Sequence, residues 1–125
     1  FILAANLMNS GKISKKLISN KKGLFAIKAE GNSMNNASIG IKNKNIESGD
    51  YVIVNSKDVS PHDGDYVVSI IDGMANIKKY RLDKKNSRIV LLSESTQEYA
   101  PIFIHENDNF MINGKVIDVI KNFKH

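Results

Sequence analysis

The feature that most constrains this fold is a series of short apolar runs, each bounded by residues that favour turns. The runs are rich in β-branched residues and occupy positions 24–27, 51–54, 66–71, 74–82, 88–92, 102–104, 110–112 and 116–120. Short runs of this composition at such spacing are typical of the strands in sandwiches and barrels. The sequence therefore predicts an all-β body with coiled, barrel-like sheets and little helix.

Turn residues indicate how some of these runs connect. Asp72 and Gly73 stand between two runs, and an Asp-Gly pair in that position favours a two-residue hairpin. Residues 84–87 indicate a second reversal. Asn113-Gly114 fits either a hairpin or a bulge in one long strand, and local rules leave both open. A helical turn or two is expected after Ser33, and a frayed helix or an extended tail over residues 121–125.

The length and composition of the chain indicate one domain. Its 125 residues, 42% of them hydrophobic, can bury a single core. Residues 1–22 form no convincing element, and we expect a linker or N-terminal arm there. Residues 23–125 are expected to form the folded domain. Because the first residue is Phe and not Met, we expect the chain to be part of a longer protein.

Several classes of chemistry are excluded or disfavoured by the composition. The chain has no Cys, which excludes disulfides, thiolate metal sites and cysteine nucleophiles, and fits a reducing, cytoplasmic location. No apolar run approaches the length of a membrane span, and no cofactor or metal is predicted. The net charge is +5, but the lysines are spread over turns and there is no Trp for base stacking. Direct DNA binding by this segment is therefore not expected.

The main candidate for chemistry is Ser33, which lies shortly after the run at 24–27. Gly31 allows the backbone to turn sharply there and to present the serine side chain. The alternative is a solvated turn serine, or one that caps a helix starting at Met34. A hydroxyl becomes a nucleophile only with a base close to it, so the choice depends on the rest of the chain.

The usual base, histidine, is poorly placed in this sequence. His62 lies in a turn, His105 at the end of a run and His125 at the terminus. Histidines at such positions are typical of a protein surface. We therefore expect all three to be surface residues and look for another base.

A lysine on the run at 74–82 is the better candidate. In a strand, successive side chains alternate faces, so Lys78 shares a face with Tyr80 and Leu82, whereas Lys79 shares one with Arg81. Burial disfavours a charged ammonium and lowers its pKa, which allows lysine to act as a base. The sequence predicts that Lys78, not Lys79, is buried and can form a serine–lysine dyad.

A series of blocks in the same order resembles the LexA-type self-cleaving peptidases, a family that includes LexA, UmuD and many phage CI-like repressors. The resemblance covers about residues 24–122. Its blocks are Gly31-Asn32-Ser33-Met34, Ser48-Gly49-Asp50-Tyr51-Val52, Asp63-Gly64-Asp65, Met74-Ala75-Asn76-Ile77-Lys78-Lys79-Tyr80, Leu91-Leu92-Ser93-Glu94-Ser95 and the closing segment 110–120.

The resemblance implies a role for individual residues. Ser33 matches the nucleophile and Lys78 the general base, and the backbone amides of Ser33 and Met34 would hold the oxyanion. Three features depart from the family pattern. Residues 39–45 form an extra loop, Lys79-Tyr80 replaces a basic residue followed by Leu, and no Ala-Gly or Cys-Gly cleavage signal is present.

The resemblance also implies a biological role. The chain would be the C-terminal domain of a repressor that cleaves itself in the DNA-damage response, or a UmuD-like mutagenesis protein. It would form a homodimer through its C-terminal segment, respond to RecA filaments, and bind DNA only through an upstream helix-turn-helix domain. The cut is expected at or just upstream of Phe1. The alternatives are a catalytically silent dimerisation module and a signal-peptidase relative acting in trans, which the absence of a membrane span disfavours.

Overall fold

A computed structural model describes residues 23–122 of the chain. The predicted arm at 1–22 and the end of the predicted tail lie outside the described residues. The described part contains seven strands and no helix, so the predicted all-β fold is confirmed. The strands are β1 (Leu24–Lys28), β2 (Tyr51–Asn55), β3 (Tyr66–Ile71), β4 (Met74–Asp83), β5 (Arg88–Leu92), β6 (Ile102–Ile104) and β7 (Phe110–Ile120).

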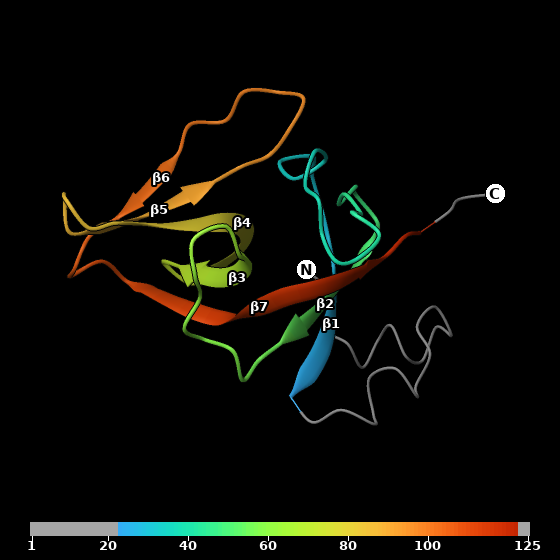
Figure 1. The fold of residues 1–125 in the computed structure, drawn as a ribbon, viewed down its shortest axis with the longest axis horizontal. Coiled ribbons are helices and arrows are strands. Elements are labelled where there is room, and N and C mark those ends of the chain that lie inside the picture. Colours follow the sequence, from blue (N-terminus) through green and yellow to red (C-terminus); the bar gives the residue numbers. More distant parts are fainter. Residues whose placement is uncertain (1–22, 123–125) are drawn as a thin grey trace.

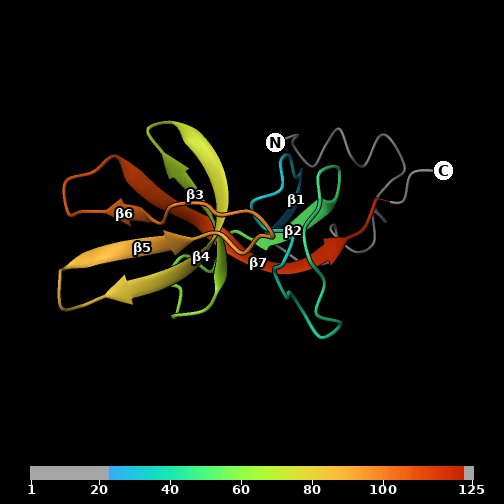
Figure 2. The ribbon, with the colours of Figure 1, turned by 90° about the horizontal axis from the view of Figure 1, so that it is seen from above.

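The strands form one antiparallel sheet in the order β1-β2-β7-β3-β4-β5-β6 (Figure 1). The last strand in the chain, β7, is third in this order and pairs with β2 near one end and with β3 near the other. Seen from above, β7 crosses the molecule, with β3 to β6 at one end and β1 and β2 at the other (Figure 2). The sheet is therefore divided into two parts that share one long strand.

Two bulges allow β7 to serve both parts. The register against β3 skips Asn113, and the register against β2 skips Ile117. Each bulge adds an unpaired residue and increases the local twist of the strand. The open question at Asn113-Gly114 is thus answered, because this pair forms a bulge within one strand and not a hairpin.

Gly114 beside the first bulge is required by a close approach of two strands. A Cβ atom placed there would lie 2.5 Å from Val54 Cγ1 and 2.7 Å from the carbonyl oxygen of Asn55. Both distances are far shorter than van der Waals contact. Only glycine therefore lets β7 pass this close to β2.

The two predicted reversals are both present. Asp72 and Gly73 have φ angles of 49° and 80°, which fits the two-residue turn that joins antiparallel strands most tightly. The turn at residues 84–87 joins β4 to β5, with Asp83 paired to Arg88. Turn chemistry alone was sufficient to predict both hairpins.

The core consists of two apolar clusters, one for each part of the sheet. Ile77 of β4 belongs to the first cluster and Tyr80 of the same strand belongs to the second. Lys78 therefore lies where β4 passes from one core to the other. The buried members of the first cluster are Ile27, Ala29, Met34, Ala37, Ile39, Ile46, Val52, Val54, Val68, Ile77, Val116 and Val119, and those of the second are Val67, Tyr80, Leu91 and Ile104.

The segment from residue 29 to residue 50 connects β1 to β2 without a regular element. Around Ser33, where a helical turn was expected, the chain forms two overlapping turns. In the first the Asn35 N–H donates to the Asn32 carbonyl at 3.4 Å, and in the second the Ala37 N–H donates to the Met34 carbonyl at 3.1 Å. The predicted extra loop is a small hairpin closed by two hydrogen bonds between Ile39 and Lys44.

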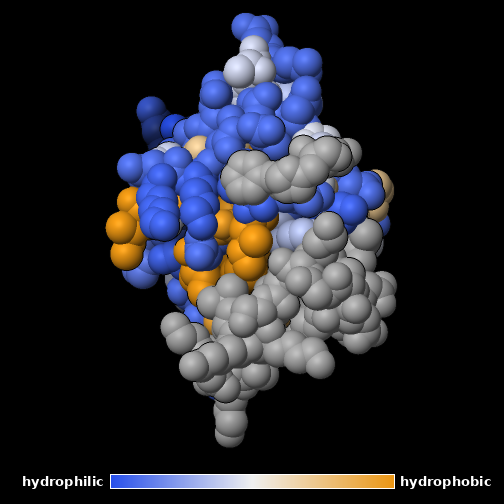
Figure 3. Space-filling model, turned by 90° about the vertical axis from the view of Figure 1, so that its right-hand side faces the viewer, coloured by the Kyte–Doolittle hydropathy of each residue, from blue (hydrophilic) through white to orange (hydrophobic). Residues whose placement is uncertain are grey.

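The tip of this small hairpin carries Ile41, whose side chain is fully exposed. Ile117, the bulged residue of β7, lines the same surface hollow and is partly exposed. Figure 3 views this end of the molecule, where an apolar area lies among mostly hydrophilic residues. The extra loop thus adds exposed apolar surface on the face away from β5 and β6.

Candidate active site

The turn that carries Ser33 begins directly after β1. Gly31 has a φ of 83° and an open space on its Cβ side, so the backbone reverses there without hindrance. Met34 is buried in the first core and anchors the turn to it. Ser33 itself is half-buried. Burial of Met34 therefore holds the serine at the surface of the core.

The backbone N–H groups of Ser33 and Met34 have no acceptor among residues 23–122. By contrast, the next amides along the turn are used, since Asn35 and Ala37 donate within it and Asn36 donates to the Glu94 carbonyl at 2.8 Å. Two adjacent unused donors beside a serine hydroxyl are the arrangement that stabilises an oxyanion in acyl transfer.

Lys78 is the buried lysine of β4, as predicted. Its exposed fraction is 9%, whereas Lys79 is half-buried and pairs with Glu94 at 3.3 Å. The predicted shared inner face holds for Tyr80 but is wrong for Leu82, which is 40% exposed. The strand leaves the second core before it reaches Leu82, so alternation alone does not define one inner face along its whole length.

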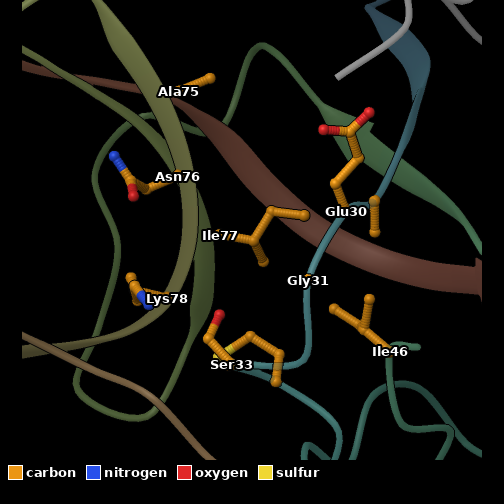
Figure 4. A pocket seen from close by; sticks show the side chains of 10 residues that line it. Glu30, Gly31, Ser33, Ile46, Ala75, Asn76, Ile77 and Lys78 are labelled. Atoms are coloured by element: carbon orange, nitrogen blue, oxygen red, sulfur yellow. The ribbon is translucent and has the colours of Figure 1, made fainter. Parts of the chain in front are cut away.

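Ser33 and Lys78 line the same pocket, although 45 positions separate them in the sequence. In Figure 4 the two side chains lie side by side, and the Ser33 hydroxyl points toward β4. The remaining lining residues are Ala29, Glu30, Gly31, Met34, Ile46, Ala75, Asn76 and Ile77. The fold thus brings together the two residues that the sequence singled out.

The Lys78 amine lies in surroundings that disfavour its charge. Burial lowers the pKa of Lys78 below the ordinary lysine value. Its nitrogen donates a hydrogen bond to Ser93 Oγ at 2.8 Å and lies 5.6 Å from the centre of the Tyr99 ring. Within residues 23–122 no direct hydrogen bond joins Lys78 to Ser33. The two share a pocket without a hydrogen bond between them in the described residues.

Sequence reasoning placed Ser93 in a matching block but gave it no role. The hairpin register contains the missing signal, because Asp83 pairs with Arg88 and Lys79 with Leu92. One step further along the same register, residue 93 stands opposite Lys78. A correct reading of the turn at 84–87 could therefore have placed this hydroxyl beside the lysine.

Residues 93–99, which we call the strap, connect the lysine to the serine turn. Ser95 Oγ donates to the Asn32 carbonyl at 2.8 Å. Asn35 and Thr96 exchange two hydrogen bonds, one from the Asn35 amide at 3.1 Å and one from the Thr96 backbone at 2.9 Å. Tyr99 also donates to the Asn32 side chain. The strap therefore holds the turn through polar contacts that are far apart in sequence.

A polar network lies beside the pocket and extends the strap toward β3. The Glu94 carboxylate accepts a hydrogen bond from Tyr66 and pairs with Lys79. Burial, followed by the hydrogen bond to Glu94, raises the pKa of Tyr66. The Tyr66 oxygen also accepts from the backbone N–H of Ser38 at 3.1 Å. This network ties together the strap, β3, β4 and the segment after Ser33.

The other residues considered for chemistry lie away from the pocket. His62 and His105 are exposed, as predicted, and His125 lies outside the described residues. Between residues 23 and 122, no group of three or more His, Asp or Glu side chains is placed to hold a metal ion. Residues 23–122 contain no helix long and apolar enough to cross a membrane.

The fold and the pocket together define a class of protein: an all-β domain in which a turn serine and a buried strand lysine share one pocket. Residues 4–117 match the sequence profile described as Peptidase S24-like. Because the match covers most of the chain, the protein belongs to the Peptidase S24-like family. The LexA-type resemblance of its sequence blocks is thereby confirmed.

The chain is also similar to several LexA repressors. It is 35% identical over 100 residues to that of Syntrophotalea carbinolica, covering 80% of this chain and 44% of the relative. It is 30% identical over 112 residues to that of Carboxydothermus hydrogenoformans, covering 90% of this chain and 49% of the relative. It is 35% identical over 98 residues to that of Petrotoga mobilis, covering 78% of this chain and 42% of the relative. The chain thus spans less than half the length of these relatives.

Proposed function

We propose that this chain is the self-cleaving peptidase domain of a LexA-like repressor, with Ser33 as nucleophile and Lys78 as general base. The observation that carries the proposal is the shared pocket, in which a half-buried serine meets a buried lysine of lowered pKa. A neutral amine can accept the proton of a serine hydroxyl without help from histidine.

The reaction follows from these two groups. Ser33 Oγ attacks the scissile carbonyl as its proton passes to the neutral Lys78 amine, which becomes an ammonium. The N–H groups of Ser33 and Met34 hold the negative oxygen of the tetrahedral intermediate. Collapse gives an ester on Ser33, and the departing amine takes the proton from Lys78. Water then hydrolyses the ester with Lys78 again as base.

The unpaired edge of β4 supports a binding mode for the scissile segment. β5 pairs with β4 only from Lys79 onward, so within residues 23–122 no strand covers this edge at residues 74–78. In the antiparallel ladder counted from the Asp72-Gly73 turn, the backbone groups of Ala75 and Ile77 point away from β3. We expect an extended peptide to add to this edge as a strand, next to Ser33.

The wider biological role rests on the relatives. We propose that the whole protein is a DNA-binding repressor whose helix-turn-helix domain precedes this chain and whose copies pair through the C-terminal segment. Stimulation by RecA filaments, a role in the DNA-damage response and a cytoplasmic location are part of the same proposal. They follow from the likeness to LexA repressors.

One observation favours a second function, a dimerisation module without peptidase activity. The Lys78 amine bonds to Ser93 and not to Ser33. An inactive relative could keep the pocket while losing the contact needed for proton transfer. A UmuD-like mutagenesis protein would share the chemistry of the first proposal and differ only in what precedes the domain.

Self-cleavage of the full-length protein tests the proposal. Incubation at increasing pH, followed by mass spectrometry, should give two fragments at a rate that rises with pH as more Lys78 becomes neutral. Ser33→Ala and Lys78→Ala should each abolish cleavage while the circular dichroism spectrum stays unchanged. Lys85→Ala, at an exposed turn of β4 and β5, should cleave at the wild-type rate.

The position of the cut is part of the same test. We expect it at or just upstream of Phe1, on a segment tethered to this domain. Tethering gives the scissile bond a high effective concentration, so the rate should not depend on protein concentration and added peptides should be cut poorly. Cleavage by the Ser33→Ala protein at the wild-type rate would show that the nucleophile lies elsewhere.

A further inference from the structure

The closest partner of the Lys78 amine is a second serine hydroxyl that the proposed chemistry does not use. Ser93 directly follows β5, and the β4–β5 register, whose last pair is Lys79 with Leu92, would place it opposite Lys78 if it were extended by one residue. Its Oγ receives a hydrogen bond from Lys78 Nζ at 2.8 Å. No other hydrogen bond of this amine is present among residues 23–122. The Ser93 hydroxyl is therefore the hydrogen-bond partner of this amine in the described part of the chain.

We propose that Ser93 is a positioning residue for Lys78, which fixes the rotation of the amine so that its lone pair is directed to the Ser33 hydroxyl. This inference rests on the proposed function. A neutral amine has two N–H bonds and one lone pair. When Ser93 accepts one N–H, the lone pair is confined to fewer directions, and proton transfer from Ser33 needs less reorganisation.

Ser93 is not itself placed to be the nucleophile. Ser33 lines the pocket beside the free edge of β4, whereas Ser93 is not part of the pocket lining. The donors suited to an oxyanion are also on the turn of Ser33. The two serines therefore have different roles: Ser33 lies on the substrate side of Lys78, and Ser93 contacts the lysine from the protein side.

The residues of the strap that follow Ser93 hold it in place. Residues 94, 95 and 96 each bond to the turn of Ser33, through the Asn36 amide, the Asn32 carbonyl and the Asn35 side chain. Because Ser93 directly precedes these contacts, the strap connects its hydroxyl to the turn of the nucleophile as well as to the base. The same short segment thus links both halves of the dyad.

The test is the pH dependence of self-cleavage in the full-length protein. Ser93→Ala should lower the maximal rate about ten- to hundredfold, because the amine loses its orientation. It should also move the midpoint of the profile to lower pH, since the ammonium loses an acceptor that favoured the charged form. Ser93→Thr keeps the hydroxyl, so both its maximal rate and its midpoint should stay at the wild-type values.

A merely structural role predicts the opposite shift. If Ser93 only kept the strap closed, its loss would admit water to Lys78 and move the midpoint to higher pH. The other titratable groups near the pocket and the strap are Glu30 on the segment before Ser33, Glu94 and Tyr99 on the strap, Tyr66 on β3 and Lys79 on β4.

A measurement independent of cleavage separates the two proposals. In the Ser33→Ala background, the Lys78 ε-carbon can be titrated by NMR with and without Ser93→Ala, and a lower midpoint in the double variant supports the inference. An unchanged or higher midpoint overturns it. Ser60→Ala, at an exposed loop position, is the matched serine control and should alter neither profile.

The outcomes distinguish which proposal fails. If Lys78→Ala leaves cleavage intact, the proposed function is wrong. If Lys78→Ala abolishes cleavage but Ser93→Ala cleaves with the wild-type rate and midpoint, only the role of Ser93 is wrong. Ser95→Ala serves as a comparison within the strap, because it removes a contact to the Ser33 turn without touching Lys78.

Discussion

The two halves of the candidate site are built in different ways. Lys78 lies on a regular strand that pairs with β3, and β5 joins its other edge one residue later. Ser33 lies on an irregular segment that the strap holds through hydrogen bonds from distant parts of the chain. The position of the lysine thus depends on the sheet, and that of the serine on a set of polar contacts.

This difference indicates which half can adjust. A ladder strand buried on both faces has little freedom, because Ile77 packs in one core and Tyr80 in the other. A turn held by exposed hydrogen bonds can shift at a small cost in free energy. We expect that binding of the scissile segment moves the Ser33 turn toward a stationary Lys78, and closes the hydrogen bond that is absent in the resting structure.

The largest effect is expected from the buried ion pair behind the serine half. Asp50 is almost fully buried and bonds to Lys121, which also bonds to the Asn45 side chain at 2.7 Å. Lys121→Ala should lower the free energy of unfolding by about 3 kcal/mol, because it leaves a buried carboxylate unpaired. Urea denaturation measures this, with the exposed Lys42→Ala as control. An equal loss of unfolding free energy in both variants would mean that the Asp50–Lys121 ion pair does not stabilise the fold.

The sheet that carries the lysine should respond strongly to crowding at Gly114. Gly114→Ala places a methyl group against Val54 and the Asn55 carbonyl. The free energy of unfolding should fall by about 2 kcal/mol, since the strands must separate to accommodate it. Asn113→Ala, at the neighbouring exposed bulge position, should change it by less than about 0.5 kcal/mol. Similar denaturation midpoints for the two variants would contradict the close packing of β2 and β7.

A smaller effect is expected from the strap. Asn35→Ala removes both hydrogen bonds to Thr96 and should cost about 1 kcal/mol in the free energy of unfolding. Its effect on cleavage should be larger than its effect on stability, because the Ser33 turn loses its register with Lys78. A double-mutant cycle with Thr96→Ala measures the coupling through the Thr96 hydroxyl alone, because the bond from the Thr96 backbone N–H remains in that variant. If the two substitutions were additive, the bond to the hydroxyl would not hold the turn.

The smallest effect is expected in the pH dependence of the unfolding free energy, which reports on the buried Lys78 itself. Burial lowers the pKa of Lys78 in the folded protein. The unfolded chain therefore binds more protons between this lowered pKa and the ordinary value of about 10.4, and stability rises with pH across that window. Lys78→Met removes the ionisable group, so its unfolding free energy should lack this rise. The exposed Lys84→Ala should retain it in thermal melts over the same pH range.

The strands and hairpins could be predicted from the sequence because their causes are local. Alternating apolar residues and β-branched side chains favour strands, and Asp72-Gly73 adopts the positive φ angles that a tight hairpin needs. The burial of Lys78 also followed from its position beside Tyr80. The choice of Ser33 as its partner required the resemblance to a known family, because no local rule connects residues 45 positions apart.

What only the tertiary structure decided concerns relations between distant segments. Leu82 was expected to be covered with Lys78, yet the strand runs beyond the core before it reaches that residue. The bulge at Asn113 became clear only when β7 was placed between β2 and β3. The partnership of Ser93 with Lys78 depends on the register of a hairpin and on a strap that folds back over the Ser33 turn. Local chemistry fixes which segments become strands, whereas packing in three dimensions determines which side chains meet.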